Sequence, residues 1–245
     1  MLIKNTQEKT ENPITKPTTK KMNAYKYYTK LDSRLEALAI EDNAIAMKKY
    51  MRNKSEFYGI KSAPRRAAVA EHLKEFGMIA TNELEAFLHY CWDSPYRELQ
   101  YSCMEIIDRE KHPPVEHLEL YEWMVLRKSW WDSIDFIAPS LMGRLFSQNT
   151  DLIKENTERY VQSGELWLQR SALIFQLKYK EKTDLNLLFQ YCERLAGEKD
   201  FFIRKAIGWS LRQAGKFCPN EVIDFVDKTE LSNLSTKEAL KHLNK

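Results

Sequence analysis

The sequence has little of what builds a β-sheet or a membrane span. Only seven of its 245 residues are glycine, and β-branched residues rarely alternate with polar ones, which favours helices over strands. No apolar run approaches the roughly 18 residues of a transmembrane helix, and residues 1–4 (MLIK) lack the apolar core of a signal peptide. We therefore expect an all-helical protein with no membrane attachment.

Cysteine and histidine are too scattered to form a disulfide framework or a metal site. No Cys-x-x-Cys or His-Glu-x-x-His occurs, and His112 and His117 flank two prolines, which makes a poor frame for a metal. Isolated cysteines in apolar helical patterns indicate free, buried thiols in a reducing compartment. We expect no metal, no cofactor and a cytoplasmic location, nucleoid-associated in a bacterium; the four cysteines are Cys91, Cys103, Cys192 and Cys218.

Three glycine-based catalytic motifs are also missing. The chain contains no Gly-x-x-x-x-Gly-Lys-Ser/Thr, no Gly-x-Gly-x-x-Gly and no Gly-x-Ser-x-Gly. Nucleotide hydrolysis, dinucleotide-dependent redox chemistry and serine-esterase chemistry therefore lack the residues that they need.

Positive charge is unevenly distributed along the chain. The formal net charge is only +3, but residues 1–21 hold five lysines against two glutamates, so the remainder is neutral overall. Within that remainder, residues 159–216 hold eleven Lys or Arg against six Asp or Glu, a net charge of +5. This asymmetry predicts one basic face on an otherwise ordinary surface. The polar residues 1–22 are predicted to form a disordered tail.

Helical periodicity dominates residues 23–245, which we interpret as one continuous domain. Ser94-Pro95 and Cys218-Pro219 match the N-cap and first position of a helix, and residues 235–238 (STKE) match a capping box. The predicted helices span residues 25–39, 42–53, 64–76, 81–92, 95–109, 115–127, 132–147, 150–162, 166–179, 184–196, 200–214, 219–227 and 235–243.

A constant interval relates three residues of this domain. Trp131, Arg170 and Trp209 are each separated by 39 positions, and Trp92 lies 39 positions before the first of them. A period near 40 residues is typical of HEAT and armadillo arrays, in which equivalent positions face the same way. The sequence therefore predicts an all-α fold, a right-handed α-solenoid of HEAT-like helical repeats, with two indoles and a guanidinium along a concave basic groove.

Most of the other aromatic residues recur at helical spacing with Leu and Ile, so we expect them to pack in the core. Trp92 fits the 39-residue interval but has no chemically active neighbour, and we place it in the core as well. The predicted core aromatics are Trp92, Trp123, Trp167, Phe175, Phe189 and Phe201.

Asp135 is the carboxylate that the local pattern leaves unexplained. It follows Trp131 by four residues, on the same face of a predicted helix, and lies one turn beyond the first-turn residues Asp132 and Ser133, for which capping and the helix dipole account. Two interpretations stay open: a partly desolvated negative charge available to a cationic ligand, or one half of a salt bridge to a neighbouring helix.

Arg170 also has two interpretations. It is either a buried ion-pair partner or a phosphate contact in a groove, and its equal spacing from Trp131 favours the groove. Downstream, Lys178 and Lys180 add a cationic edge to the same predicted surface.

The helix predicted at residues 200–214 places an indole among cations. Lys205, Trp209 and Arg212 follow the spacing i, i+4, i+7, which predicts a binding face rather than a core face. Gly208 lies in the middle of this helix, where it is unfavourable, and is expected to let another group approach the backbone.

A weaker signal precedes the helix predicted at residue 64. The loop of residues 59–66 (GIKSAPRR) offers free amides, together with Ser62 and Arg66, to a phosphate.

At these residues the chain resembles the AlkD-like DNA alkylation repair glycosylases, a family built of HEAT-like repeats. The resemblance rests on residues 128–135 (KSWWDSID), 167–180 (WLQRSALIFQLKYK) and 202–209 (FIRKAIGW), with support from residues 50–53 (YMRN) and 57–60 (FYGI). It covers the chain from about residue 40 to the C-terminus.

The resemblance implies hydrolytic removal of N3- and N7-alkylated purines, such as 3-methyladenine and 7-methylguanine, from double-stranded DNA without base flipping. By position, Asp135 matches the family's catalytic carboxylate, Trp131 and Trp209 its paired tryptophans, Arg170 its active-site arginine, and Tyr50 a tyrosine near the lesion. The expected partner is duplex DNA containing alkylated purines, bound by a monomer.

The residues suit this chemistry on their own account. An alkylated purine is already cationic, so it leaves without an acid, and one carboxylate is enough to stabilise the oxocarbenium-like sugar. Indole faces favour a nearby cation, and cations that hold phosphates do not read sequence. The alternative is a noncatalytic HEAT-repeat scaffold that binds DNA or protein, for which Asp135 between two tryptophans would have no purpose.

Overall fold

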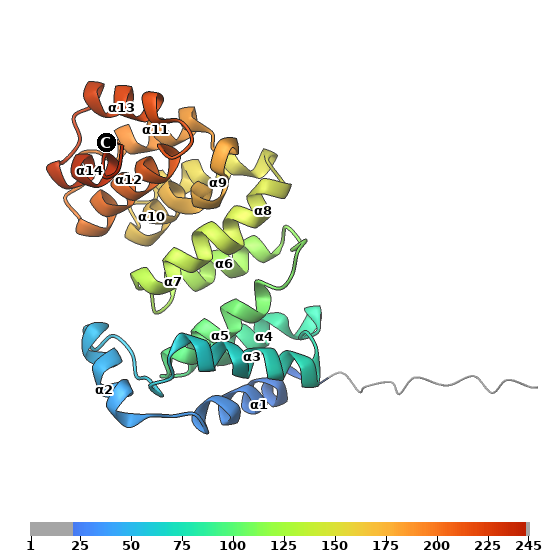
Figure 1. The fold of residues 1–245 in the computed structure, drawn as a ribbon. Helices are drawn as coiled ribbons and strands as arrows, with labels where there is room; N and C mark the ends of the chain where they lie inside the picture. The colour runs from blue at the N-terminus through green and yellow to red at the C-terminus, as the bar shows by residue number, and fades with distance from the viewer. Residues whose placement is uncertain (1–21, 244–245) are drawn as a thin grey trace, which may run out of the picture.

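The computed structural model describes residues 22–243, and every regular element within them is a helix (Figure 1). The tail predicted for residues 1–22 lies outside the described residues except for Met22. The elements are α1 (Ala24–Glu36), α2 (Glu41–Tyr50), α3 (Ser62–Phe76), α4 (Thr81–Asp93), α5 (Arg97–Ile107), α6 (His117–Leu126), α7 (Trp131–Phe136), η1 (Ile137–Met142), α8 (Gly143–Gln148), α9 (Asp151–Gln162), α10 (Leu166–Ile174), η2 (Phe175–Lys178), η3 (Lys180–Lys182), α11 (Leu185–Arg194), α12 (Phe201–Ala214), α13 (Pro219–Lys228) and α14 (Asn233–Ala239).

The helices stack on one another in a curved array. In Figure 1, α1–α5 form one end of the array, α6–α8 the middle, and α9–α14 the other end. Helix α10 packs against both α7 and α12, so the three helices that hold the 39-residue interval are neighbours in space. The all-α repeat fold predicted from that interval is confirmed.

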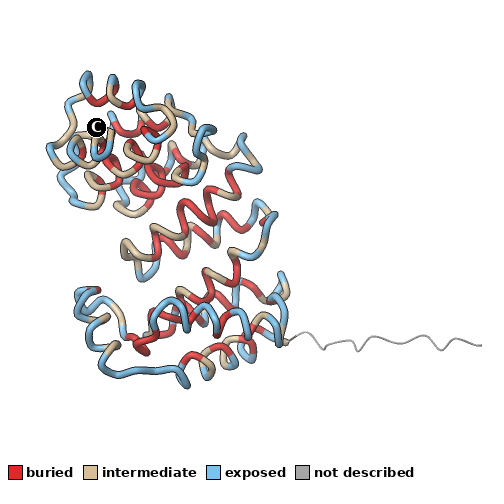
Figure 2. The backbone as a smooth tube through the Cα atoms, in the orientation of Figure 1, coloured by how far each residue is buried: buried red, intermediate tan, exposed pale blue. Residues whose placement is uncertain are grey.

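Each layer buries its apolar side chains against the next, and Figure 2 shows the buried backbone running through the interior of the array. Trp92 is buried, and its indole donates to the carbonyl of Arg127 at 3.0 Å, so its placement in the core is confirmed. Phe175 is buried too, while Trp123, Trp167 and Phe189 pack against the core from partly exposed positions. The prediction for Phe201 is wrong: this first residue of α12 is 57% exposed.

One inner helix changes its winding in the middle. Residues 131–148 form a continuous rod in which α7 passes through a π-helical segment, η1, into α8. Gly143 begins α8 where η2 crosses it closely, because a Cβ there would lie 2.4 Å from the carbonyl oxygen of Phe175. π-Helical turns widen a helix locally and occur often at functional sites. Here the turn begins two residues after Asp135.

Two helix starts differ from their predictions. Ser94 ends α4, and its hydroxyl accepts a hydrogen bond from the amide of Tyr96, so α5 begins at Arg97 rather than at Pro95. The capping box at residues 235–238 is wrong, because Ser232 caps α14 by accepting from the amide of Ser235. For α14 the capping serine therefore lies three residues before the predicted one.

The burial predicted for the cysteines is confirmed for three of the four. Cys91, Cys103 and Cys192 are buried and Cys218 is half-buried, and all four are free thiols. No helix in residues 22–243 is both long and apolar enough to cross a membrane.

Candidate functional site

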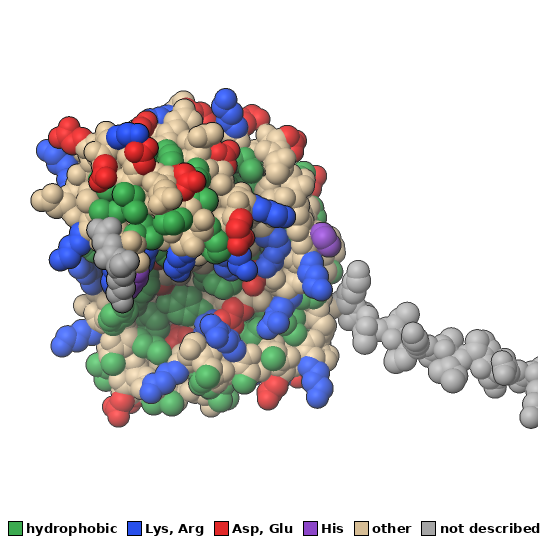
Figure 3. Space-filling view, turned by 45° about the horizontal axis from the view of Figure 1, so that its top comes forward, with side chains coloured by type: hydrophobic (Ala, Val, Ile, Leu, Met, Phe, Trp, Pro, Cys, Tyr) green, Lys and Arg blue, Asp and Glu red, His purple; other side chains and the backbone are tan. Residues whose placement is uncertain are grey.

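The three residues of the 39-residue interval meet in one pocket of about 430 Å³. Figure 3 shows the hollow between the two ends of the array, with hydrophobic side chains on its floor and Lys and Arg side chains around it. The pocket collects residues from α2, α7, α10, α12 and α14 and from the turns beside them. It is lined by Tyr50, Arg52, Trp130, Trp131, Asp135, Arg170, Phe201, Phe202, Lys205, Trp209, Arg212 and Glu238.

The packing of α10 between α7 and α12 explains how the central residues meet. Arg170 projects from α10 to Asp135 of α7, with Nε at 2.8 Å from Oδ1 and Nη2 at 3.0 Å from Oδ2. Its Nη1 donates to the carbonyl of Phe202 in α12 at 2.6 Å, and its guanidinium lies 5.9 Å from the ring centre of Trp209. One arginine therefore joins the carboxylate of one wall to the indole of the other.

Arg170 is a buried ion-pair partner, the alternative that the spacing argument disfavoured. Only 4% of the residue is exposed, and its guanidinium faces Asp135 and a backbone carbonyl rather than solvent. A guanidinium in this position holds a carboxylate at two points and fixes its orientation. The interpretation of Arg170 as a phosphate contact is corrected accordingly.

The Asp135 carboxylate combines both interpretations left open by the sequence. It is salt-bridged to Arg170, yet 21% of its side chain remains exposed at the pocket. Burial raises the pKa of Asp135 above its ordinary value, and the guanidinium of Arg170 opposes that rise. The group is thus a partly desolvated carboxylate that is held in place and open to a ligand.

Lys205, Trp209 and Arg212 line the pocket together, as their spacing predicted, but the two cations are not free. Lys205 Nζ lies 2.6 Å from Oε2 of Glu238, and Arg212 pairs with Oε1 of the same carboxylate. Gly208 explains this geometry, because α14 is the group that approaches the backbone there. The two phosphate contacts expected from the sequence are therefore engaged by a residue of the same chain.

Tyr50 forms the rim of the pocket. It ends α2, is 73% exposed, and meets the ring of Trp131 edge to face at 6.1 Å between centroids. Both aromatics also line a neighbouring pocket of about 440 Å³, which contains Ser62. Within α2 (Glu41–Tyr50) no residue is buried, so the site has one lightly packed wall.

Two of the amides that the sequence offered to a phosphate, those of Gly59 and Ile60, bind a carboxylate of the protein instead. The carboxylate of Glu98, which is buried, accepts hydrogen bonds from the amides of Tyr58, Gly59 and Ile60 at 2.9–3.1 Å. These amides are therefore occupied by the protein itself. Ser62 and Arg66 are exposed beyond them.

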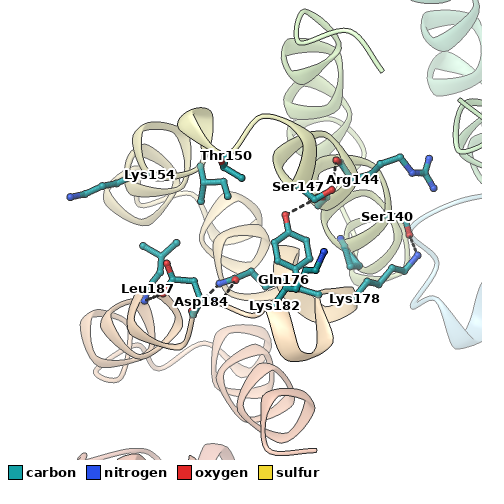
Figure 4. Close-up of a pocket in the computed structure, with 14 residues that line it drawn as sticks. Ser140, Arg144, Ser147, Thr150, Lys154, Gln176, Lys178, Lys182, Asp184 and Leu187 are labelled. Carbon is teal, nitrogen blue, oxygen red and sulfur yellow. Dashed lines mark hydrogen bonds between the residues drawn. The ribbon is translucent and has the colours of Figure 1, made fainter. Parts of the chain in front are cut away.

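Four predicted DNA contacts lie outside the central pocket: Ser62, which lines the neighbouring pocket, Arg66, Lys178 and Lys180. Arg66 is exposed beside Glu105, at 3.4 Å. Lys178 and Lys180 are exposed at η2 and η3, and Lys178 Nζ donates to Ser140 Oγ at 2.7 Å. Lys178 lines another pocket (Figure 4), which has a volume of about 710 Å³ and lies between η1, α8, α9, η2–η3 and α11.

The polar groups of this other pocket are largely engaged with one another. Gln176 exchanges hydrogen bonds with the backbone of Asp184, and Tyr179 donates to the carbonyl of Gly143. Arg144, which also lines the pocket, pairs with Asp108. Of the cationic edge that the sequence joined to the groove, Lys178 therefore belongs to this other pocket, and Lys180 lines neither of the two.

Several residues of the central pocket were missed by sequence reasoning. Arg52, with a φ of 53°, follows Tyr50 in a tight turn, and Lys54 lies over the ring of Trp130 at 5.3 Å. Phe202 packs against Trp130 at 5.2 Å between centroids. The motifs already contained Arg52, Trp130 and Phe202, so their neighbours in the sequence were a usable signal. The sequence assigned Glu238 to a capping box and not to the pocket, which it reaches from α14.

Residues 31–243 match the family model described as DNA alkylation repair enzyme, a span that includes every residue of the central pocket. The chain belongs to the DNA alkylation repair enzyme family. A solved structure from Enterococcus faecalis, described as a predicted DNA alkylation repair enzyme, has 28% sequence identity and a TM-score of 0.78, covering 84% of this chain and 97% of that one. No curated protein gives a significant match.

Membership of the DNA alkylation repair enzyme family gives the pocket a context. The family description places the chain among enzymes of alkylation repair, with DNA as the substrate. The resemblance found in residues 128–135, 167–180 and 202–209 is confirmed at the level of the family. All three segments line the pocket, and Arg170 of the second segment bonds to Asp135 of the first and to the carbonyl of Phe202 in the third.

Proposed function

We propose that this protein is a monofunctional DNA glycosylase that hydrolyses the N-glycosidic bond of cationic alkylated purines, such as 3-methyladenine and 7-methylguanine, in duplex DNA. One observation carries the proposal. Asp135 is a partly desolvated carboxylate that Arg170 orients in an open pocket walled by Trp131 and Trp209. A protein that served only as a scaffold would have no need of this arrangement.

The reaction needs little from the protein. An N3- or N7-alkylated purine is positively charged, so the base leaves with the electron pair of its C1′–N bond and becomes neutral without an added proton. The sugar is left with oxocarbenium character, as in glycoside hydrolysis. Water then forms a bond from its oxygen to C1′ and gives up a proton. Asp135 stabilises the positive sugar, orients the water, and accepts that proton.

The neighbours of Asp135 have supporting roles. Arg170 is a positioning residue, because it binds both carboxylate oxygens from one side and leaves the other lone pairs toward the pocket. Trp131 and Trp209 line the same pocket as Asp135, and an indole face attracts a cation with about 0.5–2 kcal/mol. Both effects are larger in the transition state, where the sugar is cationic, than in the ground state.

The shape of the site supports action on a stacked base. The reactive carboxylate lies in a hollow of the surface that exposed aromatics border at Tyr50 and Phe201. A duplex lying along the hollow would present its sugars to Asp135 without rotation of the base into an enclosed cavity. Basic side chains around the hollow (Figure 3) would bind phosphates without reading sequence, as damage repair requires.

The test is release of 7-methylguanine from methylated duplex DNA by the purified protein in EDTA. We expect free base and an abasic strand that stays intact until it is treated with alkali. A wild-type protein that binds the duplex but releases no base over a range of salt concentrations would contradict the proposal and favour the scaffold. Strand cleavage without alkali would contradict monofunctional action.

A further inference from the structure

Glu238 is a second carboxylate of the pocket, and the proposed reaction does not use it. It lies on α14, its side chain is only 15% exposed, and it pairs with Lys205 and Arg212. Those cations lie seven residues apart on one face of α12, so a single carboxylate bridges them. The two basic side chains on this side of the pocket are thus already paired with an acidic side chain of the same protein.

The fold makes a specific place for this carboxylate. Gly208 lies on the same face of α12, between Lys205 and Arg212, and a Cβ there would come within 2.5 Å of the Cβ of Glu238 and 2.8 Å of the carbonyl oxygen of Ser235. The hydroxyl of Ser235 also donates to the carbonyl of Arg204 at 3.0 Å. The missing side chain at position 208 is therefore what allows α14 to bring Glu238 against the two cations.

A carboxylate and a phosphate are alternative partners for such a pair of cations, since both are anions with several acceptor oxygens. Two cations with one bound carboxylate keep a net charge of +1, and they remain partly exposed at the pocket. A phosphate that approaches them meets the negative charge of Glu238 at the same place. Either anion is well bound there, and both together repel.

We propose that Glu238 occupies, in the free protein, the position that a phosphate of duplex DNA takes in the complex. DNA binding then exchanges a carboxylate for a phosphate on Lys205 and Arg212. The inference rests on the proposed function only in taking duplex DNA as the ligand. Its consequence is that Glu238 weakens binding to DNA in general, which favours release and movement along undamaged sequence.

The experiment measures equilibrium binding to an undamaged duplex as a function of salt, so it does not depend on base excision. Glu238→Gln keeps the size of the side chain, and Glu238→Ala keeps the Cβ that packs on Gly208. Each neutralised phosphate contributes about −0.9 to the slope of log K against log salt, and in the wild type the displaced carboxylate takes up a cation that offsets about one such release. We therefore expect both variants to steepen the slope by about 0.9 and to tighten binding by about tenfold at 0.1 M salt. Circular dichroism checks that each variant is folded.

Asp227→Asn is the matched control, because it removes one negative charge from an exposed position on α13. It should change the slope by much less than Glu238→Gln. Arg212→Gln completes a double-mutant cycle: its loss of affinity should be larger in the Glu238→Gln background than in the wild type, because there the arginine is free to bind phosphate.

The outcomes separate this inference from the proposed function. If folded Glu238→Gln and Glu238→Ala bind DNA like the wild type, or more weakly, Glu238 does not compete with phosphate and the inference is wrong, while the glycosylase proposal stands. If the wild type does not bind duplex DNA even at low salt, both are wrong. If Asp227→Asn changes the affinity and the salt slope as much as Glu238→Gln does, the effect comes from net charge alone, and the inference is wrong as well.

Discussion

Helix α7 carries two carboxylate–arginine pairs, one on each side, and they differ in how completely they are enclosed. Asp132 pairs with Arg97 of α5, and Asp135 pairs with Arg170 of α10. Both arginines are almost fully buried. The side chain of Asp132 is 8% exposed, whereas that of Asp135 is 21% exposed.

The hydrogen bonds widen the difference. Asp132 accepts from Nε and Nη2 of Arg97 at 2.9 and 2.7 Å and also from the hydroxyl of Tyr101. Arg97 also donates to the hydroxyl of Ser133, the backbone carbonyl of Lys128 and the side-chain carbonyl of Gln100. Among residues 22–243, only Arg170 donates to Asp135. The Arg97–Asp132 pair is thus enclosed between α5 and α7. The Arg170–Asp135 pair, in contrast, holds its carboxylate at the open pocket.

The largest effect that tests this comparison is on stability. Arg97→Gln leaves Asp132 buried without its countercharge and should lower the free energy of unfolding by about 3–5 kcal/mol, the usual loss when one partner of a buried pair is removed. Arg170→Gln should lower it by less, because water reaches Asp135 through the pocket. Urea unfolding followed by circular dichroism measures both variants, and equal losses would show that the two pairs are enclosed alike.

A second effect concerns the pH dependence of excision. The carboxylate form of Asp135 is the reactive one, so the rate should fall as the pH drops through its pKa, which burial has raised. In Arg170→Gln the opposing effect of the guanidinium is lost, the pKa rises further, and the acid limb of the single-turnover rate should move to higher pH. Asp227→Asn is the control, and its limb should coincide with that of the wild type. An unmoved limb in Arg170→Gln would mean that Arg170 does not set the ionisation of Asp135.

The smallest effect concerns DNA affinity. Since both arginines are paired inside the protein, Arg170→Gln should leave the salt dependence of DNA binding unchanged. Lys180→Gln, at an exposed position, should make the slope of log K against log salt shallower by about 0.9. A shallower slope in Arg170→Gln would return Arg170 to the role of a phosphate contact.

The sequence predicted the fold well because its signals were local or periodic. The 39-residue interval placed Trp131, Arg170 and Trp209 at equivalent positions of neighbouring helices, and the structure brings them into one pocket. The place of Asp135 in the same pocket could be predicted because it lies one helical turn after Trp131. These predictions depend only on the repeat length and on the geometry of a helix.

The predictions that failed depended on partners that are distant in sequence. The spacing of Lys205 and Arg212 gave a correct face, but it could not show that Glu238 would occupy them from another helix. In the loop of residues 59–66, the sequence likewise could not show that Glu98 would bind the amides of Gly59 and Ile60. Long-range contacts of this kind depend on how helices distant in the sequence pack together. The periodicity of a single helix contains no information about that packing.

On this account, Asp135 of the open Arg170–Asp135 pair takes part in catalysis, whereas the enclosed Arg97–Asp132 pair only stabilises the fold. This difference has a direct test. The measurement is the single-turnover rate at which Asp135→Asn and Asp132→Asn release 7-methylguanine from methylated duplex DNA. Each rate is corrected for the folded fraction of the variant. We predict that Asp135→Asn loses about 10²–10³-fold in rate, the loss typical when one preorganised charge-stabilising group is removed, with DNA binding retained. Asp132→Asn should stay within about tenfold of the wild type. A folded Asp135→Asn variant that excises at the wild-type rate, or equal losses in the two variants, would contradict the account.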